Sequence, residues 1–509
     1  MRACSQMSKT PGPIAFALFL SLSVNAIGAI TRDAYLQQGS STSIVVRWRT
    51  DSPTDSGVRY GTNATNLSLV ATNVAITTEH EISLTGLQPD TKYFYAIGTT
   101  ALVLAGDDSY FFVTAPTNAK STRIWIIGDS GGGEIDRVAA AYARFSASRD
   151  ANLWLMLGDN AYPSGRDEEY QQFVFDMFTI LLRRTVLWPT IGNHDAAGGP
   201  ADFPYLHIFS LPTNGAAGGV PSGSERYYSF DYGNIHFVCL DASSSDRSSN
   251  GVMCAWLKRD LATNNKDWLI AFWHQPPYTK GTHNSDFPTE LTEMRQNVVP
   301  ILESYGVDLV LCGHSHVYER SFMVDGHYGF SHTFLESMKK NSGNGREDGD
   351  GPYTKPTIGP APHEGTVYMV VGCSGVTTPS DVTWGLNHQA MYFGESQLGS
   401  VVIDVNGPVL EATFLRETGA IDDYFTIIKG EAGDPLRVIA YQLTEDTLTL
   451  TWNSRPGKRY QVERATSLSN LDWLPANDSI QAASTRMTWS VQFYPSVEHV
   501  FYRVVKLRD

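Results

Sequence analysis

Five polar loops in the middle of the chain each follow a short apolar stretch, and this repeated arrangement most constrains the fold. The apolar stretches favour strands, and the segments between them have the apolar spacing of helices. This alternation predicts a sheet covered by helices, with the loops at the carboxyl ends of the strands meeting in one crevice. The predicted strands are residues 123–127, 153–157, 187–191, 268–272 and 307–312. The loops after them read Gly128-Asp129-Ser130, Gly158-Asp159-Asn160-Ala161-Tyr162, Gly192-Asn193-His194-Asp195, Trp273-His274-Gln275 and Gly313-His314-Ser315-His316.

The side chains in these loops are of the kinds that bind metal ions. They offer carboxylate and phenolate oxygens, an amide oxygen and imidazole nitrogens, a set too large for one four-coordinate zinc ion. The set suits two metal ions that share a carboxylate, and such a pair can hold the attacking and leaving oxygens of a phosphoryl group. A single loop of this kind is more often a turn, but five in one chain favour a metal centre. The candidate ligands are Asp129, Asp159, Tyr162, Asn193, His274, His314 and His316.

Residues beside these ligands are interpreted as structural. Asp195 follows the third loop and is expected to support a ligand rather than to bind metal itself. Glu319 and Arg320 follow the last histidines and are interpreted as an ion pair that anchors the loop.

The overall charge and the first residues limit the class of protein. The chain has 509 residues and a formal net charge of −15, so a nucleic-acid partner bound through the whole surface is not expected. Residues 1–29 contain a short apolar core followed by small residues, which predicts a signal peptide and a secreted or periplasmic protein. No later stretch is long and apolar enough to predict a transmembrane segment. Cys312 and Cys373 lie in strand-like stretches and are interpreted as buried free thiols.

The chain is predicted to form three domains after the signal. Residues 30–116 read as β-strands, and Tyr93 after a Leu-Gln-Pro-Asp turn resembles the tyrosine corner of a fibronectin-III-like sandwich. Residues 117–429 contain the five loops and are predicted to form a four-layer αββα sandwich, with strands after Thr366 completing a second sheet. Residues 430–509 are predicted to be a small accessory β domain.

The five motifs resemble those of the calcineurin-like metallophosphoesterases. Tyr162 in Gly-Asp-x-x-Tyr narrows the resemblance to the purple acid phosphatases, and the β domain before the loops resembles the N-terminal domain of the large form of that family. The resemblance covers residues from about 30 to 429. It implies an α/β fold, the αββα metallophosphoesterase sandwich, with an N-terminal β domain before it. The small C-terminal β domain predicted from the strand pattern lies outside the resemblance.

The resemblance also implies a role for each candidate residue. Asp129, Tyr162 and His316 would hold Fe(III), and Asp159 would bridge. Asn193, His274 and His314 would hold a divalent ion, which is Zn, Mn or Fe in the family. His194 and His283 stand where the family has histidines that face the substrate. Plant-type members have a second histidine after the latter, whereas this chain has Asn284.

The function implied by the resemblance is that of an exported purple acid phosphatase. It would hydrolyse phosphate monoesters, which are small-molecule substrates, through attack by a metal-bound hydroxide at a binuclear Fe(III)–M(II) centre. A first alternative keeps the metals and changes the substrate to a phosphodiester of a nucleotide or phospholipid headgroup. A second alternative is a non-catalytic surface protein with a relic phosphatase domain.

Overall fold

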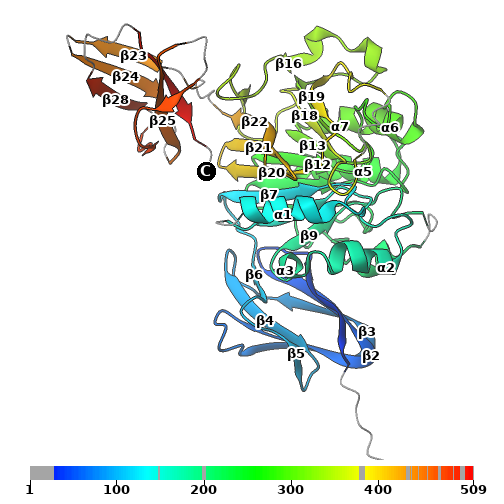
Figure 1. The fold of residues 1–509 in the computed structure, drawn as a ribbon. Coiled ribbons are helices and arrows are strands. Elements are labelled where there is room, and N and C mark those ends of the chain that lie inside the picture. The colour runs from blue at the N-terminus through cyan, green and yellow to red at the C-terminus, as the bar shows by residue number, and fades with distance from the viewer. Residues whose placement is uncertain are drawn as a thin grey trace, which may run out of the picture.

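The chain folds into three β-rich parts that follow one another in sequence order (Figure 1). The structure is a computed structural model that describes residues 28–146, 149–197, 202–377, 384–430, 436, 438–444, 446–454, 457–467, 472–484, 486–492 and 499–507. The predicted signal peptide, residues 1–29, lies outside these residues except for its last two positions. No described helix is long and apolar enough to cross a membrane.

The central part contains two seven-stranded sheets, and the five predicted strands are divided between them. The first sheet has the order β10 (Tyr228–Tyr232), β11 (Ile235–Cys239), β12 (Trp268–Phe272), β13 (Leu309–Cys312), β18 (Val367–Val371), β14 (Tyr318–Ser321) and β19 (Met391–Glu395). The second has the order β17 (Tyr353–Lys355), β22 (Ile421–Lys429), β21 (Val409–Arg416), β20 (Gly399–Asn406), β7 (Thr122–Ile127), β8 (Leu153–Met156) and β9 (Val186–Pro189). The prediction of one sheet carrying all five loops is therefore wrong, because β7, β8 and β9 pair in one sheet and β12 and β13 in the other.

The two sheets pack face to face through large apolar side chains. The ring of Trp188 on β9 stacks on Phe230 of β10 with centroids 3.7 Å apart, and Tyr318 on β14 stacks on Phe414 of β21 at 4.0 Å. Side chains alternate between the two faces of a strand, so β12 turns Ile270 toward the other sheet, into one apolar cluster. The residue before it, Leu269, lies in a separate cluster with the helices outside.

Helices cover the outer faces and complete the four layers that the sequence predicted. The structure therefore confirms the αββα fold. Over the second sheet, α1 (Ile135–Phe145) is held by Tyr142, whose ring stacks on Trp125 at 4.2 Å. The first sheet is covered by α5 (Val252–Thr263) and by a continuous helical run of α6 (Thr289–Glu293), the π-helical turn η2 (Met294–Val298) and α7 (Val299–Ser304). Shorter helical pieces are α2 (Asp167–Tyr170), η1 (Gln171–Phe175), α3 (Thr179–Leu182), α4 (Tyr205–Ile208), η3 (Ser331–Thr333) and η4 (Glu336–Met338).

The N-terminal part is a six-stranded β structure that packs beneath the central part in Figure 1. Its tyrosine corner is present, since the backbone amide of Gln88 donates to the Tyr93 hydroxyl at 3.0 Å. The buried Arg32 donates to Asp167 of the central part at 2.9 Å. Its strands are β1 (Ile30–Gln37), β2 (Ser43–Gly61), β3 (Leu69–Thr85), β4 (Lys92–Gly98), β5 (Val103–Ala105) and β6 (Phe111–Val113).

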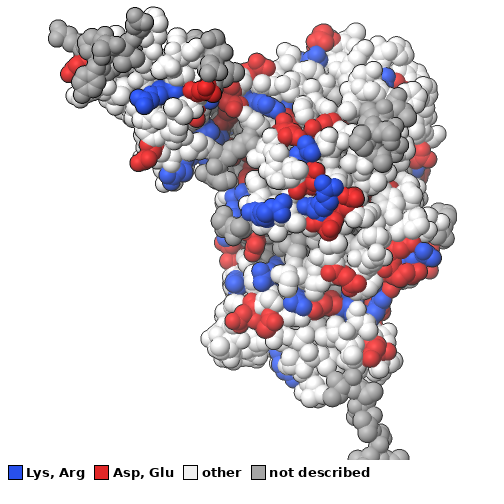
Figure 2. Space-filling model, viewed as in Figure 1, with Lys and Arg blue, Asp and Glu red and all other residues white. Residues whose placement is uncertain are grey.

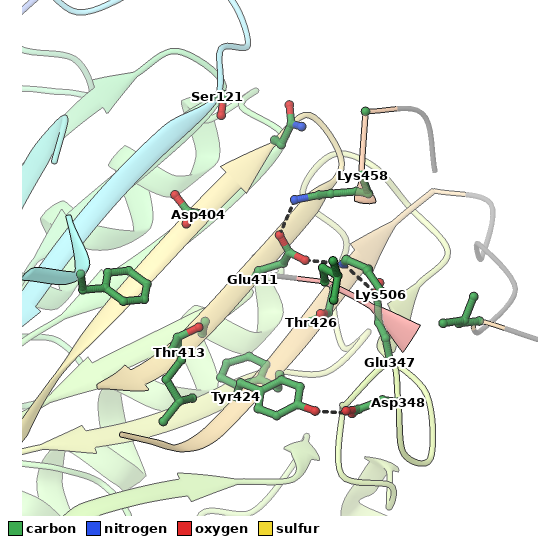
Figure 3. A pocket seen from close by; sticks show the side chains of 18 of the residues that line it. Ser121, Glu347, Asp348, Asp404, Glu411, Thr413, Tyr424, Thr426, Lys458 and Lys506 are labelled. Carbon is green, nitrogen blue, oxygen red and sulfur yellow. Dashed lines mark hydrogen bonds and ion pairs between the residues drawn. The ribbon is translucent and has the colours of Figure 1, made fainter. Parts of the chain in front are cut away.

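The C-terminal part is a small β domain that contacts the central part beside β21 and β22. Glu411 of β21 forms ion pairs with Lys458 and Lys506 of the C-terminal part, and these side chains line a pocket between the two parts (Figure 3). Acidic and basic side chains are interspersed over the face seen in Figure 2. The C-terminal strands are β23 (Val438–Leu443), β24 (Thr447–Asn453), β25 (Arg459–Ala465), β26 (Leu474–Pro475), β27 (Ile480–Gln481), β28 (Arg486–Gln492) and β29 (Phe501–Lys506).

Two further short strands of the central part, β15 (Met323–Val324) and β16 (Lys339–Asn341), pair with each other in a separate small sheet.

Candidate metal centre

The seven candidate ligands meet where the carboxyl ends of the strands in both sheets come together. Asp129, Asp159 and Asn193 follow β7, β8 and β9 of the second sheet, while His274 and His314 follow β12 and β13 of the first. The structure thus brings ligands from both sheets to one place. Asp129, Asp159 and His274 are buried, and each offers a ligand atom within 4.8 Å of the other two.

Three of the candidate ligands have backbone conformations that residues other than glycine rarely adopt. The φ angle is +51° at Asp129, +51° at Asp159 and +70° at His314. Such residues cost roughly 1–3 kcal/mol each and persist only where the surrounding structure fixes them, which is common at functional sites. Gly158 allows the close approach of the loops, since a Cβ there would lie 2.7 Å from His274 Nδ1.

Tyr162 lies between two carboxylates in the first half of the cluster. Its hydroxyl oxygen is 3.1 Å from Asp129 Oδ1, 3.0 Å from Asp159 Oδ2 and 3.3 Å from His316 Nε2. Burial, followed by the charges of Asp129 and Asp159, raises the pKa of the Tyr162 phenol far above its ordinary value. A phenol so placed would lose its proton only if a strong positive charge were bound among these oxygens.

The second half of the cluster brings acceptor atoms together. His274 donates from Nδ1 to the Leu157 carbonyl at 2.8 Å, which leaves the lone pair of Nε2 pointing into the site. That Nε2 atom is 3.3 Å from Asp159 Oδ2 and 3.2 Å from Asn193 Oδ1. His314 Nδ1 is 3.0 Å from the same amide oxygen. These atoms are the hard oxygen and imidazole nitrogen ligands that divalent metal ions prefer.

Asp159 is common to both halves of the cluster. Its Oδ2 atom contacts both Tyr162 and His274, whereas its Oδ1 atom accepts the backbone amide of His194 at 2.8 Å. Asp159 therefore stands where the sequence predicts a bridging carboxylate. The donor set, two carboxylates with a phenol on one side and an amide with two imidazoles on the other, fits a pair of metal ions.

The two histidines expected to face the substrate lie at the edge of the cluster. The side chain of His194 is 38% exposed, and its Nδ1 donates to the Pro163 carbonyl at 2.7 Å, so Nε2 is directed toward Asp159 at 3.9 Å. The ring of His283 stacks on His314 with centroids 3.9 Å apart. Asn284, where plant-type members have a histidine, is buried, and its side chain accepts the Asp286 amide at 3.1 Å.

Residues beside the ligands hold the loops in place, and one of them, Tyr170, was not singled out by the sequence. Asp195 is fully buried and, as expected, supports the loops: it accepts from Tyr170, Gly192 and Asn160. Burial and then the charge of Asp159 raise the pKa of Asp195 to about 7.

A second supporting residue, Ser315, joins the loop that carries His283 to the last metal motif. Its hydroxyl accepts the amides of Thr282 at 3.1 Å and His283 at 3.4 Å. Since Tyr170 and Ser315 are ordinary residues in sequence, only the fold reveals their contacts.

The predicted ion pair of Glu319 and Arg320 is wrong. Neighbouring residues on a strand point to opposite faces, so the two side chains cannot meet. Arg320 pairs instead with Asp423 of β22, at 2.6 and 2.8 Å. Glu319 accepts hydrogen bonds from the Thr279 hydroxyl and from the Lys280 amide, and so holds the loop before His283.

Comparison with known proteins agrees with this geometry. Residues 122–318, which contain every candidate ligand, match the family model described as calcineurin-like phosphoesterase. The chain therefore belongs to the calcineurin-like phosphoesterases. Residues 32–114 match the model described as the purple acid phosphatase N-terminal domain, and on both matches we identify the chain as a member of the purple acid phosphatase family.

Individual relatives are moderately similar. The chain is 30% identical over 274 residues to purple acid phosphatase 23 of Arabidopsis thaliana, covering 47% of this chain and 57% of that protein. It is 30% identical over 277 residues to purple acid phosphatase 15 of the same plant, covering 48% and 50%. The chain thus spans about half the length of these curated relatives. The solved structure of purple acid phosphatase PPD1 from yellow lupin (Lupinus luteus) seeds has the same fold, with a TM-score of 0.60, 18% identity and coverage of 79% of this chain and 75% of that one.

Proposed function

We propose that the chain is an exported acid phosphatase that hydrolyses small phosphate monoesters at a binuclear metal centre. The observation that carries this proposal is the placement of Asp159 between two half-sites of different chemistry. A phenol and a carboxylate lie on one side of it, and imidazoles and an amide oxygen on the other.

The two half-sites suit two different ions. Asp129, Tyr162 and His316 would hold Fe(III), because a phenolate favours a hard, highly charged ion. Asn193, His274 and His314 would hold a divalent ion such as Zn, Mn or Fe. When bound, the pair of ions would neutralise charge on the phosphoryl oxygens and activate water as the nucleophile.

The protein's own side chains would complete the reaction. His194 is oriented by the Pro163 carbonyl and partly exposed, so its Nε2 would hold a phosphoryl oxygen or supply a proton to the leaving alkoxide. His283, whose ring stacks on His314, would share this role. Because the amide side chain of Asn284 cannot serve as a general acid, proton supply from this loop would fall to His283.

Rates on a phosphate monoester and on a diester would test the proposal. We expect the purified protein, loaded with iron and a divalent metal, to hydrolyse p-nitrophenyl phosphate far faster than bis(p-nitrophenyl) phosphate. A much faster reaction with the diester would favour the phosphodiesterase alternative. Protein that binds metal but hydrolyses neither ester would contradict the phosphatase proposal, and protein that binds no metal would favour the non-catalytic alternative.

A further inference from the structure

Two large aromatic side chains lie exposed beside the loop that carries His283. Phe287 is 71% exposed and Trp384 is 43% exposed. Their ring centroids are 6.1 Å apart and their planes are inclined by 43°. The two rings form a continuous exposed apolar surface, and larger surfaces of this kind commonly mark binding sites.

Backbone hydrogen bonds fix the segment that carries Phe287 and His283 beside the candidate metal centre. It lies four residues after His283, and its amide donates to the Asn284 carbonyl at 3.2 Å in a tight turn. Four residues span at most about 14 Å even when fully extended, and the turn makes the separation shorter. The His283 amide in turn donates to Ser315, between the two last candidate ligands.

Residues before and after Trp384 also form hydrogen bonds to the loops beside the candidate metal centre. The Leu386 amide donates to the Lys280 carbonyl at 2.9 Å, in the loop before His283. On the other side, the Thr377 hydroxyl donates to the carbonyl of His316 at 3.1 Å. Both aromatic rings therefore belong to chain segments that are fixed beside the candidate metal centre, on the side of His283.

We propose that Phe287 and Trp384 form a subsite for an aromatic ring on the leaving group of the substrate, so that the preferred substrates are aryl or nucleoside phosphate monoesters. The inference rests on the proposed function, because it places the phosphate at the metal ions and the leaving group beside His283. A ring that extends outward from this position would meet the two exposed aromatic side chains, and stacking on aromatic faces tolerates rings of different chemistry.

Kinetics with matched substrates test this subsite. Phenyl phosphate and a nucleoside 5′-monophosphate carry a ring, whereas glycerol 3-phosphate does not. In Phe287→Ala and in Trp384→Ala, we expect KM for the ring-bearing esters to rise roughly 5- to 50-fold, the range that loss of one stacking contact gives. The rate with glycerol 3-phosphate should stay within about twofold, and Phe287→Tyr should retain wild-type values because it keeps the ring.

A matched control is Tyr441→Ala, which removes another exposed aromatic side chain, 75% exposed on β23 of the C-terminal part. This variant should leave all the substrates unaffected. An equal loss for esters with and without a ring in the Phe287 and Trp384 variants would overturn the subsite in favour of a structural role. No loss for any ester would overturn it as well.

Binding of phosphonates separates the subsite from the proposed function, since it needs no turnover. By calorimetry on the metal-loaded protein, phenylphosphonate should bind more tightly than methylphosphonate, and the difference should disappear in Phe287→Ala. If monoesters are not hydrolysed but this difference is seen, the subsite stands and the phosphatase proposal fails. Equal affinities for the two phosphonates in the wild-type protein would overturn the subsite.

Discussion

At the scale of single residues, the candidate metal centre depends on where individual atoms of Asp159 point. Oδ1 is held by the His194 amide, and this contact turns Oδ2 toward Tyr162 on one side and His274 on the other. The left-handed backbone at Asp159 and Asp129 makes this orientation possible. Asp, Asn and His tolerate that conformation better than most residues, so the choice of residue satisfies both the backbone and the chemistry.

Loss of a ligand on the divalent side should reduce activity strongly. In Asn193→Ala or His274→Ala, the hydrolysis of p-nitrophenyl phosphate should fall by at least about 100-fold, because the ion held by these side chains would be lost. Metal content, measured by mass spectrometry on the purified variants, should fall by about one ion per chain. His207→Ala, an exposed histidine outside the cluster, is the control. A wild-type rate in either variant would contradict the site.

Removal of the Tyr162 hydroxyl should remove the colour of the protein. A tyrosinate bound to Fe(III) gives a visible charge-transfer band, and Tyr162 is the phenol that lies between Asp129 and Asp159. Tyr162→Phe should therefore be colourless after iron loading. Tyr170→Phe, in which the lost hydroxyl contacts Asp195 instead, should keep the band. A Tyr162→Phe protein that stays purple would rule out this ligand.

At the scale of secondary-structure elements, buried charged groups join strands to helices in the central part. His236 on β11 contacts Asp231 on β10 through Nδ1 at 2.7 Å and Asp260 on α5 through Nε2 at 2.8 Å. Burial alone would lower the pKa of His236, but the hydrogen bonds and charges of Asp231 and Asp260 outweigh it and raise the pKa to about 9. The imidazolium thus connects a hairpin to the helix above it.

This contact should make stability depend on pH in the alkaline range. Because the folded pKa of about 9 exceeds the ordinary value of 6.5, the stabilisation is fully present below pH 6.5 and is lost as the pH rises through 9. The shift corresponds to about 3 kcal/mol. Urea unfolding of the wild type and of His236→Gln should differ most at pH 6 and least at pH 10.

The control for this experiment is His207→Gln, since the His207–Asp202 pair is exposed on both sides. Its difference from the wild type should stay small at every pH, because exposed ion pairs contribute little to stability. A His236→Gln difference that is the same at pH 6 and pH 10 would mean that the imidazole is not charged in the folded protein.

At the scale of the whole molecule, two β domains are attached to the central sandwich by different kinds of contact. The N-terminal part buries Arg32 against Asp167 at its interface. The C-terminal part is held beside β21 by Lys458 and Lys506, which both pair with Glu411 (Figure 3). Burial alone would raise the pKa of Glu411, but the charges of Lys506 and Lys458 outweigh it and lower the pKa to about 2.

Attachment of the C-terminal part should therefore depend on the charge of Glu411. Its stabilising effect is present above the ordinary carboxyl pKa of 4.5 and is lost as the pH falls through 2, so the contact should survive at mildly acidic pH. In Glu411→Gln, we expect faster proteolysis between the two parts and a larger radius of gyration by small-angle scattering. Glu463→Gln, which breaks a pair with Arg503 inside the C-terminal part, is the control.

An unchanged radius of gyration and cleavage rate in Glu411→Gln would mean that apolar contacts hold the C-terminal part. High salt should also have a smaller effect on this contact than on exposed ion pairs, because partly buried pairs are screened less.

Much of the fold and of the candidate site could be predicted because the signals are local. Apolar strands followed by short loops that contain Asp, Asn or His are visible along the chain, and each loop carries its ligands whatever its neighbours are. The tyrosine corner at Tyr93 and the buried free thiols of Cys312 and Cys373 were also predicted from local patterns, and the structure confirms them.

The side chains that can bind metal, and the strand before each loop, could be predicted from the order of residues alone. The division of these strands between two sheets could not, because strand pairing joins residues far apart in the chain. The tertiary structure also decided that Arg320 pairs with Asp423 rather than with Glu319. The aromatic pair of Phe287 and Trp384 depends on the fold in the same way, since almost a hundred residues of chain separate two rings that lie 6.1 Å apart.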